Sequence, residues 1–390
     1  MYVMGKEEAE AASRVIASGQ LFRYRGGEGE VDQFEREWAA KIGTEHAVAV
    51  TSGTAALICA LVGLGIGPGD EVIVPGYTFM ATAIAVLAVG ALPVIAEVDE
   101  SLTLDPADAE RKVTPRTRAL IPVHMNGLPC DLDGVMAVAQ RHGLLVLEDA
   151  CQADGGSYRG RRLGSIGDAG AFSFNYFKII TCGEGGAVVT NSREVYERAV
   201  IMHDGGCAFW DQVMVKQTPI FGGCNFRLNE ILGAILRVQL GRLDGILAAL
   251  RAEKRRLREE LAGERAFALS PVRDPEGDCA TTLGLLFPSG EQARAFMARL
   301  QQAGVGCGSP INSGRHVYVN WEPVMNQLGA HHPALDPYRL ATAPVKYSPD
   351  MCPRTLSALE RTVFLGLSAT RQPQELAEII ANIKQAAQAA

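Results

Sequence analysis

A chain of 390 residues, 47% of them hydrophobic and 21% charged, has the size and composition of a globular protein with a large buried core. The net charge of −7, without a dense run of basic residues, argues against a nucleic-acid partner, and no apolar stretch is long enough to span a membrane. Nine cysteines that form no CxxC pair predict neither a metal site nor a disulfide framework, but reduced thiols in a cytoplasmic protein.

Short strands and helices alternate from about residue 45 to residue 190. The sequence predicts strands at 46–53, 70–76, 92–99, 117–127, 144–149, 170–176 and 185–191, and helices at 54–66, 81–90 and 132–143. Strands of this length separated by helices predict a mostly parallel sheet that is covered on both faces. In such sheets, ligands bind at the carboxyl ends of the strands.

The pattern changes after residue 225. Residues 225–261 carry apolar side chains at three- and four-residue spacing, which predicts one long helix. Residues 281–305 then predict a strand, a turn and a helix, the usual unit of a small α+β domain. We therefore expect a large ligand-binding domain at 1–245 and a smaller C-terminal domain at 246–390.

The stretch VTSGTAAL joins a predicted strand to an apolar helix through Ser52, Gly53 and Thr54. A glycine lets the backbone approach a ligand closely, and the N–H groups at a helix N-terminus bind anions. The same hydroxyl side chains would serve equally well as a helix cap. Alone, this motif does not decide between the two roles.

Two further residues complete a set with this turn. The strand LLVLED ends at Asp149, which is either an ordinary strand-end carboxylate or the partner of a cationic ring nitrogen. Lys178 follows an aromatic-rich stretch and precedes a glycine-rich one, either on the surface or in a pocket. Pyridoxal 5′-phosphate (PLP) requires an anion site for its phosphate, a carboxylate for its ring nitrogen and an amine for its aldehyde. The three motifs together favour PLP.

Four motifs resemble those of a known family. SGTAAL, EDACQA, FSFNYFKIITCGEGGAVVTN and NFRLNE, in this order, are similar to motifs of the sugar and cyclitol aminotransferases, which are fold-type I PLP enzymes. The resemblance covers nearly the whole chain, and a subgroup of octulosonate aminotransferases and aminohydroxybenzoate synthases is most similar. It implies an α/β fold with a large domain, whose mostly parallel sheet lies between helices, and a smaller C-terminal α+β domain.

The resemblance implies roles for single residues. Lys178 forms the Schiff base and moves the proton, and Asp149 pairs with the ring nitrogen. The other cofactor contacts that it implies are Gln152 at the ring hydroxyl, Phe79 on the ring face, and Gly53, Thr54, Ala55 and Ser173 at the phosphate. Asn225 corresponds to a residue that reaches the phosphate of the neighbouring subunit, which implies a homodimer with active sites at its interface. Core packing for Phe79 and a turn position for Asn225 are the alternatives.

The substrate side of the site departs from the family pattern. Asn175 stands where many members carry His, and Asn126 stands where Tyr is common. By position, Tyr24, Arg25 and His316 are candidates for substrate contact, with roles in a loop or in the core as the alternatives. These departures leave the substrate open.

The resemblance implies a PLP-dependent aminotransferase of amino-sugar biosynthesis, serving a glycan or an antibiotic. Such an enzyme takes an amino group from L-glutamate or L-glutamine and passes it to a ketone or aldehyde of a sugar or cyclitol. A ping-pong mechanism follows from one cofactor that alternates between two states. Dehydration or aromatisation on the same fold, and a non-catalytic regulatory protein, are the alternatives.

Overall fold

A seven-stranded sheet forms the centre of the computed structural model, which describes residues 2–24, 28–207, 217–341, 343 and 345–388. The order of its strands is β1-β9-β8-β5-β4-β2-β3. Their bounds are β1 His46–Val50, β2 Glu71–Pro75, β3 Leu92–Ala96, β4 Thr117–Leu120, β5 Leu145–Asp149, β8 Ala169–Ser173 and β9 Gly186–Thr190. Neighbours from β8 to β3 are parallel, and β9 is antiparallel to both β1 and β8. The predicted, mostly parallel sheet is confirmed.

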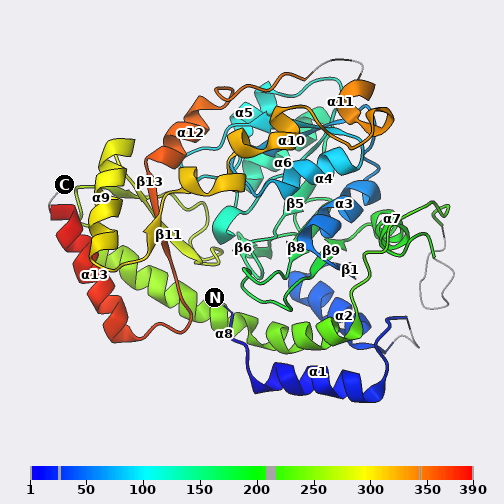
Figure 1. The fold of residues 1–390 in the computed structure, drawn as a ribbon, viewed down its shortest axis with the longest axis horizontal. Helices are drawn as coiled ribbons and strands as arrows, with labels where there is room; N and C mark the ends of the chain where they lie inside the picture. Colours follow the sequence, from blue (N-terminus) through cyan, green and yellow to red (C-terminus); the bar gives the residue numbers. More distant parts are fainter. Residues whose placement is uncertain (1, 25–27, 208–216, 342, 344, 389–390) are drawn as a thin grey trace.

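Both faces of this sheet are buried under helices (Figure 1). In β1, Val48 and Val50 point to one face and belong to the core formed with α3 (Gly53–Gly63), α4 (Ala81–Ala88) and α7 (Arg193–His203). Ala47 and Ala49 point to the other face and belong to the core formed with α2 (Glu30–Ile42) and α8 (Glu230–Leu261). The helices α5 (Pro106–Arg111) and α6 (Leu132–His142) contribute apolar side chains to a third core with β2, β4 and β5. Because successive side chains point to opposite faces, strands buried on both sides are apolar throughout.

Several strands end earlier than predicted, and two of these ends have a clear local cause. The strand β4 ends at Leu120, shortly before Pro122, which has no N–H to donate to a ladder. The strand β8 ends at Ser173, because the chain then turns and the Lys178 N–H bonds to the Asn175 carbonyl at 2.9 Å. This turn gives Lys178 its place beyond the carboxyl end of the strand.

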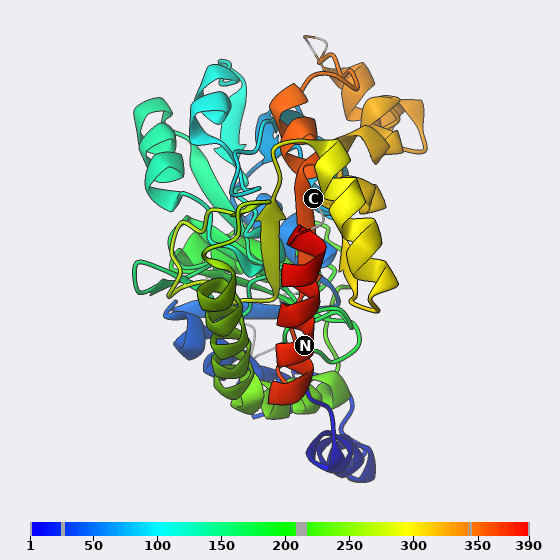
Figure 2. The ribbon, with the colours of Figure 1, turned by 90° about the vertical axis from the view of Figure 1, so that its left-hand side faces the viewer.

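A smaller antiparallel sheet lies in the C-terminal part of the described chain, with the strand order β10-β11-β13-β12. Its strands are β10 Ala268–Leu269, β11 Thr282–Leu286, β12 Cys307–Gly308 and β13 Thr362–Gly366, and a separate two-stranded ribbon consists of β6 Ser157–Tyr158 and β7 Arg161–Arg162. The helices α9 (Gly290–Gln302) and α13 (Pro373–Gln388) pack beside the four-stranded sheet (Figure 2). The strand, turn and helix predicted over 281–305 are confirmed by β11 and α9.

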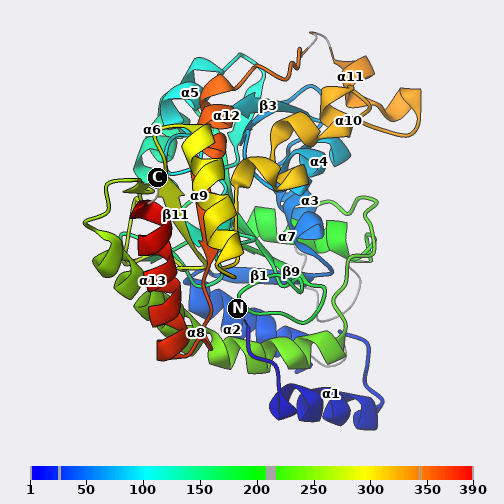
Figure 3. The ribbon, with the colours of Figure 1, turned by 60° about the vertical axis from the view of Figure 1, so that its left-hand side comes forward.

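The long helix α8 links the two sheets. It begins at Glu230 because Asn229 caps it, with the Leu232 N–H donating to Asn229 Oδ1 at 3.1 Å, and it continues to Leu261. It runs from beneath the large sheet to α13, and α1 (Lys6–Ser18) lies along its outer side (Figures 1 and 3). The predicted boundary at residue 245 falls inside this helix, so the division into 1–245 and 246–390 stays a prediction.

The segment after β12 returns to the large sheet. It includes the short helices α10 (Glu322–Met325), α11 (Pro337–Leu340) and α12 (Pro353–Glu360). The Tyr318 N–H donates to the Gly76 carbonyl at 3.1 Å, and Tyr318 is buried with α4. This attachment brings the neighbouring residue His316 to the carboxyl ends of the large sheet. Among the residues described, no helix has the length and apolar character needed to cross a membrane.

Candidate active site

A cavity of about 690 Å³ opens at the carboxyl ends of β1, β5 and β8. Eight of the predicted site residues line it: Gly53, Thr54, Phe79, Asp149, Gln152, Ser173, Lys178 and His316. They come from regions as distant in sequence as residue 53 and residue 316. The fold therefore brings most of the predicted set to one place.

The turn after β1 forms one wall of the cavity. A Cβ atom on Gly53 would lie only 2.7 Å from the Ser173 Cβ and 2.9 Å from the Cys151 Sγ, so only glycine fits. The Ser52 Oγ accepts the Ala55 N–H at 3.1 Å, which is the helix-cap role left open by the sequence. The N–H groups of Gly53 and Thr54, in the first turn of α3, have no partner within the helix. They can bind an anion beside the Ser173 side chain.

The carboxylate of Asp149 lies at the end of β5 and is almost fully buried. The Thr82 hydroxyl donates to its Oδ2 at 2.7 Å, and the Cys151 N–H donates to its Oδ1 at 3.2 Å. Both contacts fix the orientation of the carboxylate toward the cavity. A buried carboxylate in this position can accept a hydrogen bond from a cationic ring nitrogen.

Gln152 is held by Asn126, one of the two residues that depart from the family pattern. The Gln152 Oε1 accepts the Asn126 N–H at 3.0 Å, and the Thr281 hydroxyl donates to the Asn126 carbonyl at 2.5 Å. Asn126 adopts the left-handed region with φ 55°, which asparagine tolerates better than most residues. Asn126 therefore orients Gln152 through its backbone.

Several titratable groups surround Lys178, which is partly buried. Burial raises the pKa of the Cys151 thiol well above its usual value, so this neighbour is neutral. Asp154 is fully buried, and burial raises the pKa of its carboxyl group, while the charge of Lys178 acts in the opposite direction. Burial, and then the charge of Lys178, lower the pKa of His316, so its imidazole is neutral.

Phe79 and His316 lie together at the cavity. Their ring centroids are 5.3 Å apart, and Phe79 is 44% exposed rather than packed in the core. The Met80 N–H donates to the Arg315 carbonyl at 3.0 Å, which ties the segment that contains His316 to the start of α4. An exposed aromatic ring on a cavity wall is suited to stacking on a planar ligand.

Four predicted residues are not among the described residues that line the cavity, and the first is Ala55, whose N–H bonds to Ser52. Tyr24 is buried, and its hydroxyl bonds to the His203 Nε2 at 2.7 Å, so it does not line this cavity. Asn225 is exposed, accepts the Arg227 N–H at 3.3 Å and also lies outside the cavity lining. Arg25 lies outside the described residues. The substrate role of Tyr24 and the cofactor role of Asn225 stay predictions.

The sequence interpretation missed two features of the site. Thr82 orients Asp149 across 67 positions of sequence, and no motif indicated this pairing. Glu184 lines the cavity and bonds to Asn175. The glycines on either side of Glu184 predict a turn, but they give no signal for the role of its carboxylate.

Comparisons with known proteins agree with this geometry. Residues 3–384 match the DegT/DnrJ/EryC1/StrS aminotransferase family. The chain is 47% identical over 279 residues, 70% of each chain, to a dTDP-3-amino-3,4,6-trideoxy-alpha-D-glucose transaminase of Streptomyces venezuelae. It is 36% identical over 336 residues, 84% of each chain, to a 3-amino-5-hydroxybenzoate synthase of Amycolatopsis mediterranei. The crystal structure of S. venezuelae DesV in complex with a ketimine intermediate is similar with a TM-score of 0.80 and 34% identity, over 98% of this chain and 94% of that one.

Proposed function

The chain belongs to the DegT/DnrJ/EryC1/StrS aminotransferase family, and from this premise we propose that it binds PLP and transfers an amino group from L-glutamate or L-glutamine to a keto or aldehyde group of a sugar or cyclitol. Its fold is that of the fold-type I PLP aminotransferases. Its similarity to named transaminases supports transamination in amino-sugar biosynthesis. The cofactor, the donor and the acceptor are the parts that we propose.

One observation supports the proposal most strongly: the Asp149 carboxylate and Lys178 line the same cavity as the N-terminus of α3. These are the three groups that PLP needs, for its ring nitrogen, its aldehyde and its phosphate. Because Gly53 has no Cβ, the turn packs closely against Ser173, and its backbone can come close to a phosphate. The residues present therefore fit the cofactor.

When bound, PLP supplies an electron sink for the bond that breaks at the substrate α-carbon. Lys178 would be the base that takes the proton from this carbon and returns it to the cofactor. Asp149, oriented by Thr82, would keep the ring nitrogen protonated, because the carboxylate lies in a buried site. Phe79 would cover the ring face, and Gln152 would bond to the ring hydroxyl.

We propose a homodimer as the active form. Asn225 is exposed and lies outside the cavity of its own chain, which suits a residue that reaches the phosphate of a neighbouring subunit. Phe177, an exposed aromatic residue of the cavity lining, and its exposed neighbour Tyr176 suit the same contact. The nine cysteines are all free thiols, which supports a reducing compartment such as the cytoplasm.

The similarity to a 3-amino-5-hydroxybenzoate synthase favours aromatisation as the second candidate. That reaction uses the same cofactor site, so the cavity alone does not separate the two activities. The products separate them: transamination releases 2-oxoglutarate from L-glutamate, whereas aromatisation releases water and no keto acid.

Lys178→Ala tests the central role of the lysine. The wild-type protein with PLP is expected to be yellow, and L-glutamate is expected to bleach the yellow band and to release 2-oxoglutarate. The variant keeps the phosphate site, so it should still bind PLP, but it should lose the yellow band and all measurable transfer. Absorption spectra and an assay for 2-oxoglutarate measure both effects.

Lys384→Ala is the matched control, because it removes an amine of α13 that lies outside the cavity lining and should leave the spectrum and the rate unchanged. A wild-type protein that stays colourless in excess PLP would contradict the proposed cofactor. Transfer at the wild-type rate by the Lys178 variant would contradict the role of the lysine.

A further inference from the structure

A side-chain pair at the cavity connects the two ends of the loop that carries Lys178. The Asn175 Nδ2 donates to the Glu184 Oε1 at 2.7 Å. The Asn175 Oδ1 accepts the Phe177 N–H at 3.1 Å, and the Tyr176 N–H donates to the Gly183 carbonyl at 2.9 Å. The backbone therefore brings residues 175 and 184 together, and the Asn175 amide then fixes the position of the Glu184 carboxylate.

Glu184 is placed to meet a ligand. It lines the cavity together with Lys178, while it remains exposed to solvent. The bond to Asn175 uses Oε1, so Oε2 is not occupied by that bond. Among the charged side chains of the described lining, Asp149 and Lys178 are assigned to the cofactor in the proposed function. Glu184 has no part in the proposed cofactor contacts or in the proposed proton transfer.

His316 provides a second acceptor at the same cavity. Its Nδ1 lies 3.0 Å from the Ser313 carbonyl oxygen, so this nitrogen must carry the proton of the neutral ring. The other nitrogen, Nε2, is then a hydrogen-bond acceptor. A carboxylate and an imidazole that both accept hydrogen bonds match a ligand with several hydroxyl donors.

We propose that Glu184 binds hydroxyl groups of the amino acceptor near its carbonyl, and that Asn175 is the positioning residue that holds Glu184 for this contact. This inference rests on the proposed function, because it concerns only the second half of the transfer. It also gives Asn175 a role, acting through Glu184, that its sequence position does not show.

The test separates the two half-reactions by stopped-flow absorption. L-glutamate bleaches the yellow band in the first half, and a ketone restores it in the second. The probes are scyllo-inosose and a dTDP-linked keto-sugar, which are rich in hydroxyl groups, and cyclohexanone, which has none. We expect the wild type to convert the more efficient of the two hydroxylated probes with a higher catalytic efficiency than cyclohexanone. In Glu184→Gln, the efficiency with that probe should fall by about tenfold or more, because a hydrogen bond to a charged group is lost.

Three controls keep the outcomes apart. The rate with L-glutamate should not fall in Glu184→Gln, and the rate with cyclohexanone should change by less than about twofold. Glu194→Gln removes the same charge at an exposed position outside the cavity and should behave as the wild type. A wild type that shows no yellow band with PLP before L-glutamate is added would contradict the proposed function instead, whatever Glu184 does.

A double-mutant cycle tests the role of Asn175. Asn175→Ala should lower the efficiency with the hydroxylated probe, and adding Glu184→Gln should cause little further loss, because both changes break one contact. Fully additive losses, or an equal loss with L-glutamate, would assign Asn175 to the support of the loop alone. A wild-type enzyme that converts cyclohexanone as well as every hydroxylated probe would overturn the inference.

Discussion

Single residues in this site work under close steric limits. Gly53 faces Ser173 and Cys151 at distances that leave no room for a side chain. A methyl group at this position would push the turn away from the end of β8, where both the phosphate site and the loop of Lys178 begin. The small size of one residue thus sets the distance between two parts of the site.

Gly53→Ala should lower the free energy of unfolding by about 1–3 kcal/mol, because it overpacks the contact with Ser173. It should also weaken PLP retention, because the N–H groups of the turn move. Thermal denaturation and equilibrium dialysis of PLP measure the two effects. Gly245→Ala in α8, where a Cβ meets no atom within 4 Å, is the control and should stabilise the protein by up to about 1 kcal/mol. Unchanged stability and PLP affinity in the Gly53 variant would refute the steric argument.

At the end of the strand β5, one side chain supports the fold and its neighbour belongs to the site. The strand β5 ends in two carboxylates that point to opposite faces, Asp149 to the cavity and Glu148 to the interior. Glu148 accepts the N–H groups of Gly164, Ile166 and Gly167 at 2.6–2.8 Å, and it bonds to the His124 Nε2 at 3.0 Å. Burial raises its pKa, but these hydrogen bonds outweigh burial and lower the pKa below the usual value of 4.5. Glu148 therefore anchors the loop that leads from β5 to β8.

Glu148→Gln should lower the free energy of unfolding at pH 7 by about 3 kcal/mol, because buried N–H donors lose a charged acceptor. Since the folded-state pKa is lowered, the carboxylate contributes its full stability above pH 4.5, the ordinary value, and loses it as the pH falls through the folded-state pKa. The difference between variant and wild type should therefore shrink in acid. Urea unfolding at several pH values tests this. A difference that stays constant with pH would show that the charge of Glu148 is unimportant.

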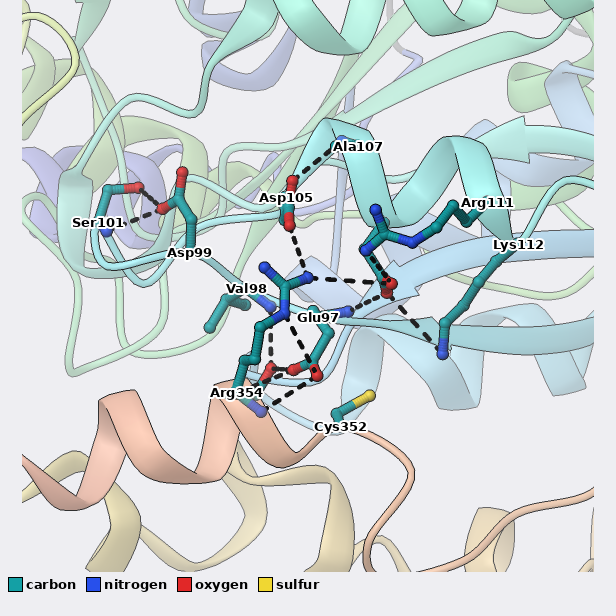
Figure 4. Close-up of polar contacts among 12 residues, drawn as sticks. Glu97, Val98, Asp99, Ser101, Asp105, Ala107, Arg111, Lys112, Cys352 and Arg354 are labelled. Carbon is teal, nitrogen blue, oxygen red and sulfur yellow. Dashed lines mark hydrogen bonds and ion pairs between the residues drawn. The ribbon is translucent and has the colours of Figure 1, made fainter.

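The whole molecule depends on attachments between its C-terminal part and the large sheet. Figure 4 shows Arg354, at the start of α12, between the carboxylates of Glu97 and Asp105. The Glu97 Oε2 accepts the Thr355 N–H at 2.7 Å, and Oε1 accepts the Arg354 N–H at 3.1 Å. Glu97 therefore caps α12 from a residue that directly follows β3. This attachment holds the C-terminal segment on the large sheet, along with the contact of Tyr318.

Glu97→Gln should loosen α12 without unfolding the large sheet. An amide cannot accept all the donors of the helix N-terminus, so we expect a loss of about 2 kcal/mol, confined to the opening of α12. Hydrogen exchange measured by mass spectrometry should rise in α12 and stay unchanged in β5. Equal increases in both elements would indicate that the attachment stabilises the whole fold. Asp350→Asn, an exposed carboxylate in the loop before α12, is the control.

Local patterns determined much of this protein from its sequence. Strand and helix periodicity depends on neighbours in the chain, so the parallel sheet and the long helix were predictable. Gly53 and Asp149 end predicted strands and Lys178 follows one, and the carboxyl ends of strands in such a sheet lie together. Their meeting in one cavity was therefore predictable as well.

Only the tertiary structure decided which side chains meet across the fold. The Tyr24 hydroxyl bonds to the His203 Nε2, a contact across 179 positions that no motif indicated, while its substrate role stays a prediction. Thr82 reaches Asp149, and Glu184 reaches Asn175, through contacts that no spacing in the sequence encodes. Such contacts depend on how separate elements pack and where each loop returns, and these are properties of the assembled fold rather than of any local stretch of chain.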